Sequence, residues 1–134
     1  MSGPPSRVSR LLERTRTDLD RVDPDRLGPV AERGALVVDI RPEADRRRDG
    51  DLPGAVVVER IHLEWRLDPS SPDRLDGAVP GRRVVVVCNE GYASSLAAAA
   101  LRGLGVDATD LVGGYRAWRD HATSAGRREP AADQ

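Results

Sequence analysis

The sequence predicts an α/β fold in which a mostly parallel sheet is flanked by helices on both faces. Residues 35–40 and 83–87 are short apolar runs rich in β-branched residues, which is typical of strands buried on both faces. Segments with helical spacing alternate with such runs, and this alternation favours right-handed βαβ units. A length of 134 residues leaves room for one domain of this kind.

The first twenty residues are predicted to be an extension that precedes the domain. Residues 1–5 are rich in Gly, Pro and Ser, which indicates a mobile end. Across residues 6–20, apolar positions such as Val8, Leu11 and Leu19 recur at helical spacing between charged residues. We therefore expect an extra amphipathic helix that packs one face on another surface.

The domain itself is predicted to cover residues 21–122. Asp23 followed by Pro24 is a typical helix start, and Gly34 is a typical stop. The remaining residues, 123–134, are polar and are expected to form a flexible tail. We expect four strands, over residues 35–40, 54–58, 83–87 and 109–112. Between and around them we expect helices over 23–34, 61–67 and 115–121, helical turns over 42–48, and a helix that is capped by Ser94 or Ser95 and ends near residue 102.

Charge and hydropathy exclude several classes of partner. The net charge is −1 and acidic and basic residues are interleaved, so we expect no nucleic-acid partner. The longest apolar run is far shorter than a bilayer requires, and no signal peptide is evident, which predicts a cytoplasmic protein without a membrane partner. All 21 basic residues are Arg, which excludes chemistry that needs a lysine amine.

The chain contains one cysteine and two histidines. Cys88 alone cannot form an internal disulfide. His62 and His121 lie far apart and lack a partner at ligand spacing, so we expect neither a metal nor an organic cofactor.

Cys88 stands at the end of the strongest predicted strand, where ligands gather in α/β folds. The segment after it, residues 89–95, joins this strand to an alanine-rich helix, and Gly91 allows a sharp turn. Such a loop can point successive backbone N–H groups at one centre, and the helix N-terminus adds partial positive charge. A thiolate is the species that these groups stabilise, so Cys88 is a candidate nucleophile. The alternative is a small buried residue that ends a strand.

Four stretches carry a resemblance to a known family. They are Asp-Ile-Arg at 39–41, Gly-Asp-Leu-Pro-Gly-Ala at 50–55, Cys-Asn-Glu-Gly-Tyr-Ala-Ser-Ser at 88–95, and Gly-Gly-Tyr-Arg-Ala-Trp at 113–118. In this order, over about residues 21–122, the chain resembles a rhodanese-type (thiosulfate sulfurtransferase-like) domain. The resemblance implies a rhodanese-like fold with a small parallel sheet between helices.

The resemblance also implies an activity and a site. Family members load sulfur from a donor onto the loop cysteine as a persulfide and pass it to an acceptor. The donor would be a small anion such as thiosulfate, or a persulfide, and the acceptor a low-molecular-weight thiol or a protein thiol. Cys88 matches the sulfur-carrying cysteine. The anion cradle corresponds to Asn89, Glu90, Gly91, Tyr92, Ala93 and Ser94.

The loop also bears on the substrate. Related phosphatases and arsenate reductases place an arginine six positions after the cysteine, where this chain has Ser94, so their chemistry is disfavoured. Many thiosulfate-active members place a cation where Ala93 stands, and Glu90 adds a carboxylate. We therefore expect thiosulfate to be a poor donor. A non-catalytic or redox-sensing binding module remains the alternative.

Two pairs of residues outside the loop have expected supporting roles. Arg60 and Arg66 follow the second predicted strand and could lean over the loop to supply positive charge, although a solvated helix face is the simpler interpretation. Asp39 and Arg41 are expected to brace each other or neighbouring loops of the family fold, and a direct contact of either with the substrate is the less favoured alternative.

Overall fold

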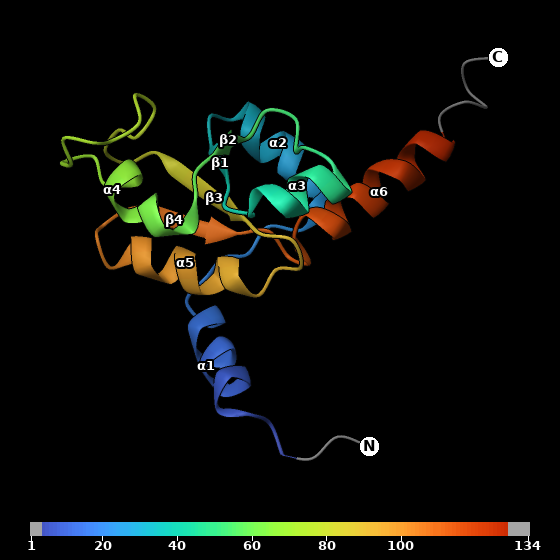
Figure 1. The fold of residues 1–134 in the computed structure, drawn as a ribbon, viewed down its shortest axis with the longest axis horizontal. Helices are drawn as coiled ribbons and strands as arrows, with labels where there is room; N and C mark the ends of the chain where they lie inside the picture. Colours follow the sequence, from blue (N-terminus) through green and yellow to red (C-terminus); the bar gives the residue numbers. More distant parts are fainter. Residues whose placement is uncertain (1–3, 129–134) are drawn as a thin grey trace.

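A four-stranded parallel sheet forms the centre of the computed structural model, which describes residues 4–128 (Figure 1). The strand order is β2-β1-β3-β4, and all three neighbouring pairs are parallel. The predicted α/β fold is confirmed. Within the described residues the strands are β1 (Leu36–Asp39), β2 (Val56–Val57), β3 (Arg83–Val87) and β4 (Asp107–Asp110).

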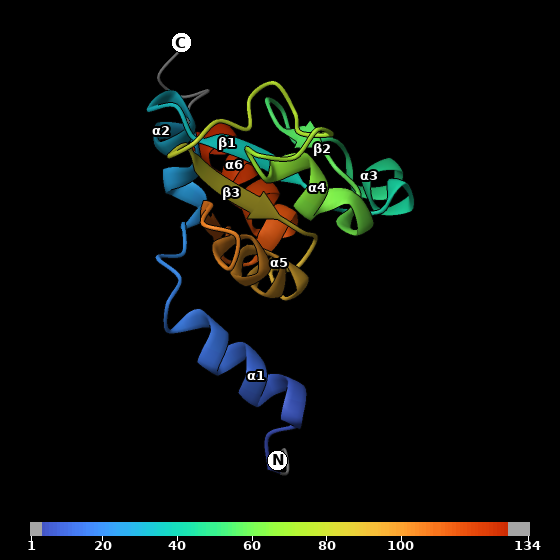
Figure 2. The ribbon, with the colours of Figure 1, turned by 90° about the vertical axis from the view of Figure 1, so that its left-hand side faces the viewer.

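Helices connect the strands and cover both faces of the sheet (Figures 1 and 2). The described helices are α1 (Arg7–Arg16), η1 (Pro24–Arg26), α2 (Leu27–Glu32), α3 (Glu43–Asp49), η2 (Arg60–His62), α4 (Leu63–Leu67), α5 (Ala93–Arg102) and α6 (Gly114–Arg128). In this part of the chain no helix combines the length and the hydropathy that crossing a bilayer requires.

The two faces of β3 belong to two separate hydrophobic clusters. Val84 and Val86 pack with the buried residues of α4 and α5. Val85 and Val87 pack on the other face with side chains from α2 and α6. Successive residues of a strand point to opposite faces, so an unbroken run of valine suits a strand that is covered on both sides.

The N-terminal helix differs from its prediction. It spans Arg7–Arg16 and contains no buried residue, so it does not pack a full apolar face on the domain. Figures 1 and 2 show α1 extending away from the body of the molecule. Leu19, which we assigned to this helix, lies beyond its end and is buried in the core instead.

Three further boundaries also differ. The predicted buried strand at 54–58 is reduced to β2, a two-residue strand at the edge of the sheet, where Val57 is 46% exposed. The last strand, β4, begins at Asp107, two residues before the predicted start at residue 109. Its two acidic residues are accommodated because Arg83 donates to Asp107 and Arg21 donates to Asp110. Helix α6 continues to Arg128, past its predicted end at residue 121, and residues 129–134 of the expected tail lie outside the described residues.

The outer edge of the sheet beside β4 is extended by an isolated bridge. Val22 pairs in parallel with Leu111 and donates its N–H to the carbonyl of Asp110 at 2.9 Å. The N–H of Val112 in turn donates to the carbonyl of Val22 at 2.8 Å. The chain between α1 and η1 therefore lies against the carboxyl end of β4.

Candidate functional site

Cys88 directly follows β3, at the carboxyl end of a central strand. Its Sγ accepts hydrogen bonds from the N–H of Gly91 at 3.1 Å and the N–H of Ser94 at 3.3 Å. The residue is 8% exposed and opens onto a pocket of about 360 Å³. The sulfur thus lies at a concave surface with two backbone donors directed at it. The pocket is lined by Ile40, Arg41, Pro42, Asp45, Arg60, Cys88, Asn89, Glu90, Tyr92 and Ala93.

Gly91 permits this loop geometry in two ways. Its φ is +87°, in the left-handed region that favours glycine. A Cβ at this position would also lie 2.7 Å from the backbone nitrogen of Gly113, closer than real contacts allow. The cysteine loop and the turn before α6 can therefore touch only because no side chain separates them.

The carbonyl groups of Cys88 and Asn89 are turned toward α6. The N–H of Tyr115 donates to the carbonyl of Cys88 at 2.8 Å, and the N–H of Arg116 donates to that of Asn89 at 3.1 Å. These donors belong to the first turn of α6, whose N–H groups have no partner within the helix. Holding the carbonyls there leaves the N–H groups of the loop free to face the sulfur.

Behind the loop lies a fully buried carboxylate, Asp110 at the end of β4. It accepts hydrogen bonds from the hydroxyls of Ser94 and Ser95, both at 2.7 Å. It also forms an ion pair with Arg21, whose Nε lies 2.8 Å away. The two serines therefore do not cap α5 as predicted: the helix begins at Ala93 and includes both of them, and their hydroxyls bind Asp110 of β4.

Asp39 and Arg41 form the predicted ion pair beneath the pocket. The guanidinium donates to both carboxylate oxygens, from Nε to Oδ1 at 3.1 Å and from Nη2 to Oδ2 at 2.8 Å, and both side chains are essentially fully buried. Arg41 also donates to the carbonyl of Gly50 at 2.9 Å and lies 3.9 Å from the centre of the Tyr115 ring. This arrangement fixes the end of β1, the end of α3 and the start of α6 relative to one another.

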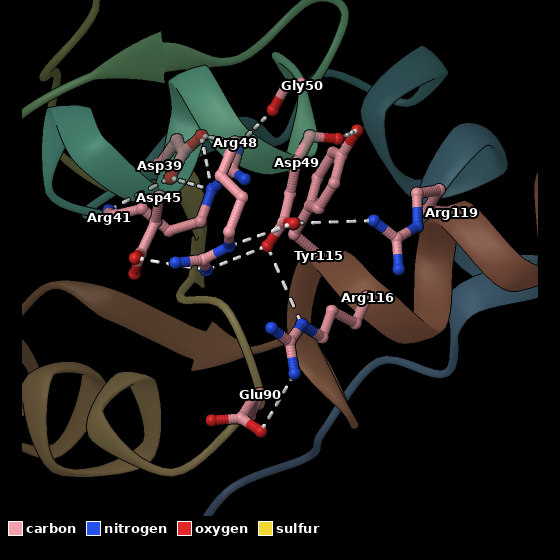
Figure 3. Close-up of polar contacts among 10 residues, drawn as sticks. All are labelled: Asp39, Arg41, Asp45, Arg48, Asp49, Gly50, Glu90, Tyr115, Arg116 and Arg119. Atoms are coloured by element: carbon pink, nitrogen blue, oxygen red, sulfur yellow. Dashed lines mark hydrogen bonds and ion pairs between the residues drawn. The ribbon is translucent and has the colours of Figure 1, made fainter.

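Asp49 lies at the centre of a second group of charges (Figure 3). Arg48 donates to this carboxylate at 2.9 Å, and Arg116 lies 3.6 Å from it. The hydrogen bond from Arg48 is the main cause that lowers the pKa of Asp49 to about 2. Arg116 also pairs with Glu90 at 3.4 Å, so this group joins α3 to α6 and the cysteine loop.

Asn89 is tied to the same group. In the amide orientation that satisfies both neighbours, its nitrogen donates to Asp49 at 3.2 Å and its oxygen accepts from Arg116 at 3.1 Å. The side chain of the first residue after the cysteine is thus held by two other elements.

The two arginines predicted to supply charge are separated by the fold. Arg60 lines the pocket beside Cys88, but it also forms an ion pair with Glu64 at 2.8 Å. The structure does not bring Arg66 to the pocket, because its guanidinium donates to the carbonyl of Asp73 at 2.7 Å. The pocket lining contains two arginines and two carboxylates, those of Asp45 and Glu90, so it has no excess of positive charge.

Sequence reasoning missed the residues that hold the loop from outside. Arg21 and Asp110 are examples, since each is an ordinary charged residue in sequence and only the fold brings them together. A weak signal existed for Asp110, because an acidic residue directly before an apolar pair in a predicted strand needs a partner. Within residues 4–128 no group of three or more His, Cys, Asp and Glu side chains is arranged to hold a metal ion.

Comparison with known proteins assigns this geometry to a family. Residues 24–121 match the model of the rhodanese-like domain. The thiosulfate sulfurtransferase GlpE of Pseudomonas savastanoi pv. phaseolicola is 33% identical over 104 residues, covering 77% of this chain and 90% of the relative.

Solved structures agree on the fold. A rhodanese homologue from Thermus thermophilus has a TM-score of 0.53 at 32% identity, covering 72% of this chain and 98% of its own. A Rhodopseudomonas palustris protein of unknown function, described as a possible tyrosine phosphatase, has a TM-score of 0.77 at 27% identity, covering 91% of this chain and 96% of its own.

Proposed function

The chain belongs to the rhodanese-like domain family, and from this premise we propose that it is a sulfurtransferase whose Cys88 carries the transferred sulfur. The observation that carries the proposal is the pair of N–H groups, from Gly91 and Ser94, directed at Sγ at the pocket. Backbone donors fixed in this way stabilise negative charge without reorganisation. They suit both a thiolate and the anion that forms when sulfur is transferred.

In the first half-reaction the Cys88 thiolate attacks the outer sulfur of the donor. A new S–S bond forms at Cys88, and the bond between the outer sulfur and the rest of the donor breaks. The bonding electrons leave with that remainder, which is sulfite from thiosulfate or a thiolate from a persulfide. In the second half-reaction an acceptor thiolate attacks the outer sulfur and restores the Cys88 thiolate, so no net oxidation of the protein occurs.

The charges of the pocket favour a persulfide over thiosulfate as donor. Glu90 and Asp45 line the pocket together with Arg41 and Arg60, and each of these four charges already has a partner of opposite sign. A thiosulfate dianion would therefore gain little net attraction. A persulfide of a low-molecular-weight thiol carries less charge at its reacting end and fits this lining better.

Phosphate-ester hydrolysis is the function suggested by the description of the Rhodopseudomonas palustris structure. The residue six positions after Cys88 is Ser94, so this position has no guanidinium to offer a phosphate. Its hydroxyl donates to Asp110 instead. Bidentate recognition of a phosphate by arginine is therefore missing from the loop.

The proposal is tested by intact-mass measurement after incubation with thiosulfate or with a low-molecular-weight persulfide. We expect wild type to gain one sulfur atom, more readily from the persulfide, and to lose it when an acceptor thiol is added. Because the chain has one cysteine, Cys88→Ser is a complete control and is expected to gain none.

Two outcomes would overturn this function. One is a wild type that gains no sulfur from either donor yet takes up oxygen from peroxide, as a redox-sensing module would. The other is hydrolysis of an aryl phosphate that disappears in Cys88→Ser.

A further inference from the structure

The backbone carbonyl of Gly91 is held by two guanidinium groups from the N-terminal part of the chain. Arg16, the last residue of α1, donates from Nη2 at 2.7 Å. Arg21 donates from its Nη2 at 3.1 Å. Both arginines lie outside residues 24–121, the part that matches the family model.

Gly91 is a position at which such a contact has consequences for the sulfur. Its own N–H donates to Sγ of Cys88, while its carbonyl, on the other side of the same Cα, receives the two guanidinium groups. The residue has a φ of +87°, and glycine has wide conformational freedom. Contacts on both sides of this Cα therefore restrict the direction of the N–H that faces the sulfur.

Arg16 and Arg21 also reach the second donor. Arg16 donates from Nε to the hydroxyl of Ser95 at 3.0 Å, and that hydroxyl donates to Asp110. Arg21 pairs with the same carboxylate, which also accepts from the hydroxyl of Ser94. Ser94 provides the second N–H to Sγ, so one connected set of hydrogen bonds holds both donors.

The charge of these arginines matters because the loop lacks a cation of its own. Residues 88–95 contain no Arg, and they include Glu90. The guanidinium of Arg16 is half-buried and lies 5.8 Å from the centre of the Tyr92 ring, which also belongs to the loop. A charge held in a partly buried place is less screened than one on the open surface.

We propose that Arg16 is a positioning residue for Cys88, so that α1 forms part of the sulfur-transfer site although it extends away from the domain. The proposal rests on the function proposed above. Arg16 acts through the Gly91 peptide and the Ser95 hydroxyl and does not itself touch the sulfur. Because α1 has no buried residue, removing this contact is expected to change the loop far more than the stability of the fold.

The experiment compares Arg16→Gln with Arg16→Lys and with Arg14→Gln in the full chain. Arg14 lies on the last turn of the same helix and its side chain is exposed, so its variant controls for loss of one positive charge from α1. Two quantities are measured: the rate of Cys88 alkylation by iodoacetamide across pH, and kcat and KM for a low-molecular-weight persulfide. The thermal unfolding midpoint is recorded for each variant.

In Arg16→Gln we expect Cys88 to be alkylated at least about threefold more slowly than in wild type at neutral pH. A threefold change in rate corresponds to a shift of about half a unit in the pH midpoint of alkylation. The midpoint moves upward, because a less ordered loop stabilises the thiolate less, and kcat falls while the unfolding midpoint stays unchanged. Arg16→Lys, which keeps a charged donor, should recover part of the rate, and Arg14→Gln should behave as wild type.

Two results would overturn the proposal. One is that Arg16→Gln and Arg14→Gln have the same alkylation profile. The other is that Arg16→Gln loses reactivity only in proportion to a lower unfolding midpoint. Alkylation requires no sulfur donor, so a failure of the proposed function and a failure of this inference are distinguishable.

Discussion

Replacement of the buried carboxylate at the end of β4 should destabilise the protein strongly. In wild type, Asp110 accepts hydrogen bonds from both nitrogens of Arg21 that face it, and from the hydroxyls of Ser94 and Ser95. In Asp110→Asn the side chain loses its charge, and its amide nitrogen faces groups that are themselves donors. Arg21, only 17% exposed, is left without its counter-charge.

The size of this effect follows from burial. Breaking a buried ion pair by removing one partner costs about 3–5 kcal/mol, since the other charge stays buried without compensation. Asp107, on the same strand, pairs with Arg83 at the same distance of 2.8 Å, but the side chains are 47% and 28% exposed. For Asp107→Asn we expect a loss of at most about 1 kcal/mol.

The assay is urea unfolding at neutral pH followed by circular dichroism, with the free energy of unfolding compared between the two variants and wild type. A third variant, Arg21→Gln, completes a double-mutant cycle with Asp110→Asn, and the double change should cost less than the sum of the two single changes. The reasoning is refuted if Asp110→Asn costs no more than Asp107→Asn.

Two further predictions follow from the loop and from the charges beside it. Gly91→Ala should lose about 1–3 kcal/mol in urea unfolding and exceed Gly81→Ala, which shares a positive φ but has open space around its Cβ; equal losses would contradict the close approach to α6. Asp49, whose pKa is lowered from 3.8 to about 2 mainly by the hydrogen bond from Arg48, contributes stability that is fully present above pH about 3.8 and is lost as the pH falls through about 2. Thermal melts over this range should therefore fall more steeply in wild type than in Asp49→Asn, and parallel curves would argue against the ion pair.

The sequence was most informative where local pattern and environment agree. The valine-rich runs of β1 and β3 predict strands covered on both faces because only such strands need apolar side chains at every position. The strand-to-helix loop after Cys88 was recognisable from its glycine and its place at a strand end. These local signals were sufficient to place the pocket.

Other features depend on partners that are distant in sequence. Strand β4 contains Asp107 and Asp110, which disfavour a strand until Arg83 and Arg21 are brought beside them. The role of Arg16 depends on where α1 ends relative to the loop, and helical periodicity does not give that position.

The edge strands of the sheet are short, which limits pairing with strands of other molecules. On one side β2 offers only two residues, and on the other β4 offers four, with Val22 paired to Leu111 just beyond the end of β4. Exposed strands act as templates on which another polypeptide can add its own backbone, and long flat ones promote aggregation. Because both edge strands are short, the sheet offers a neighbouring molecule few backbone groups to pair with, even though its central strands are almost entirely aliphatic.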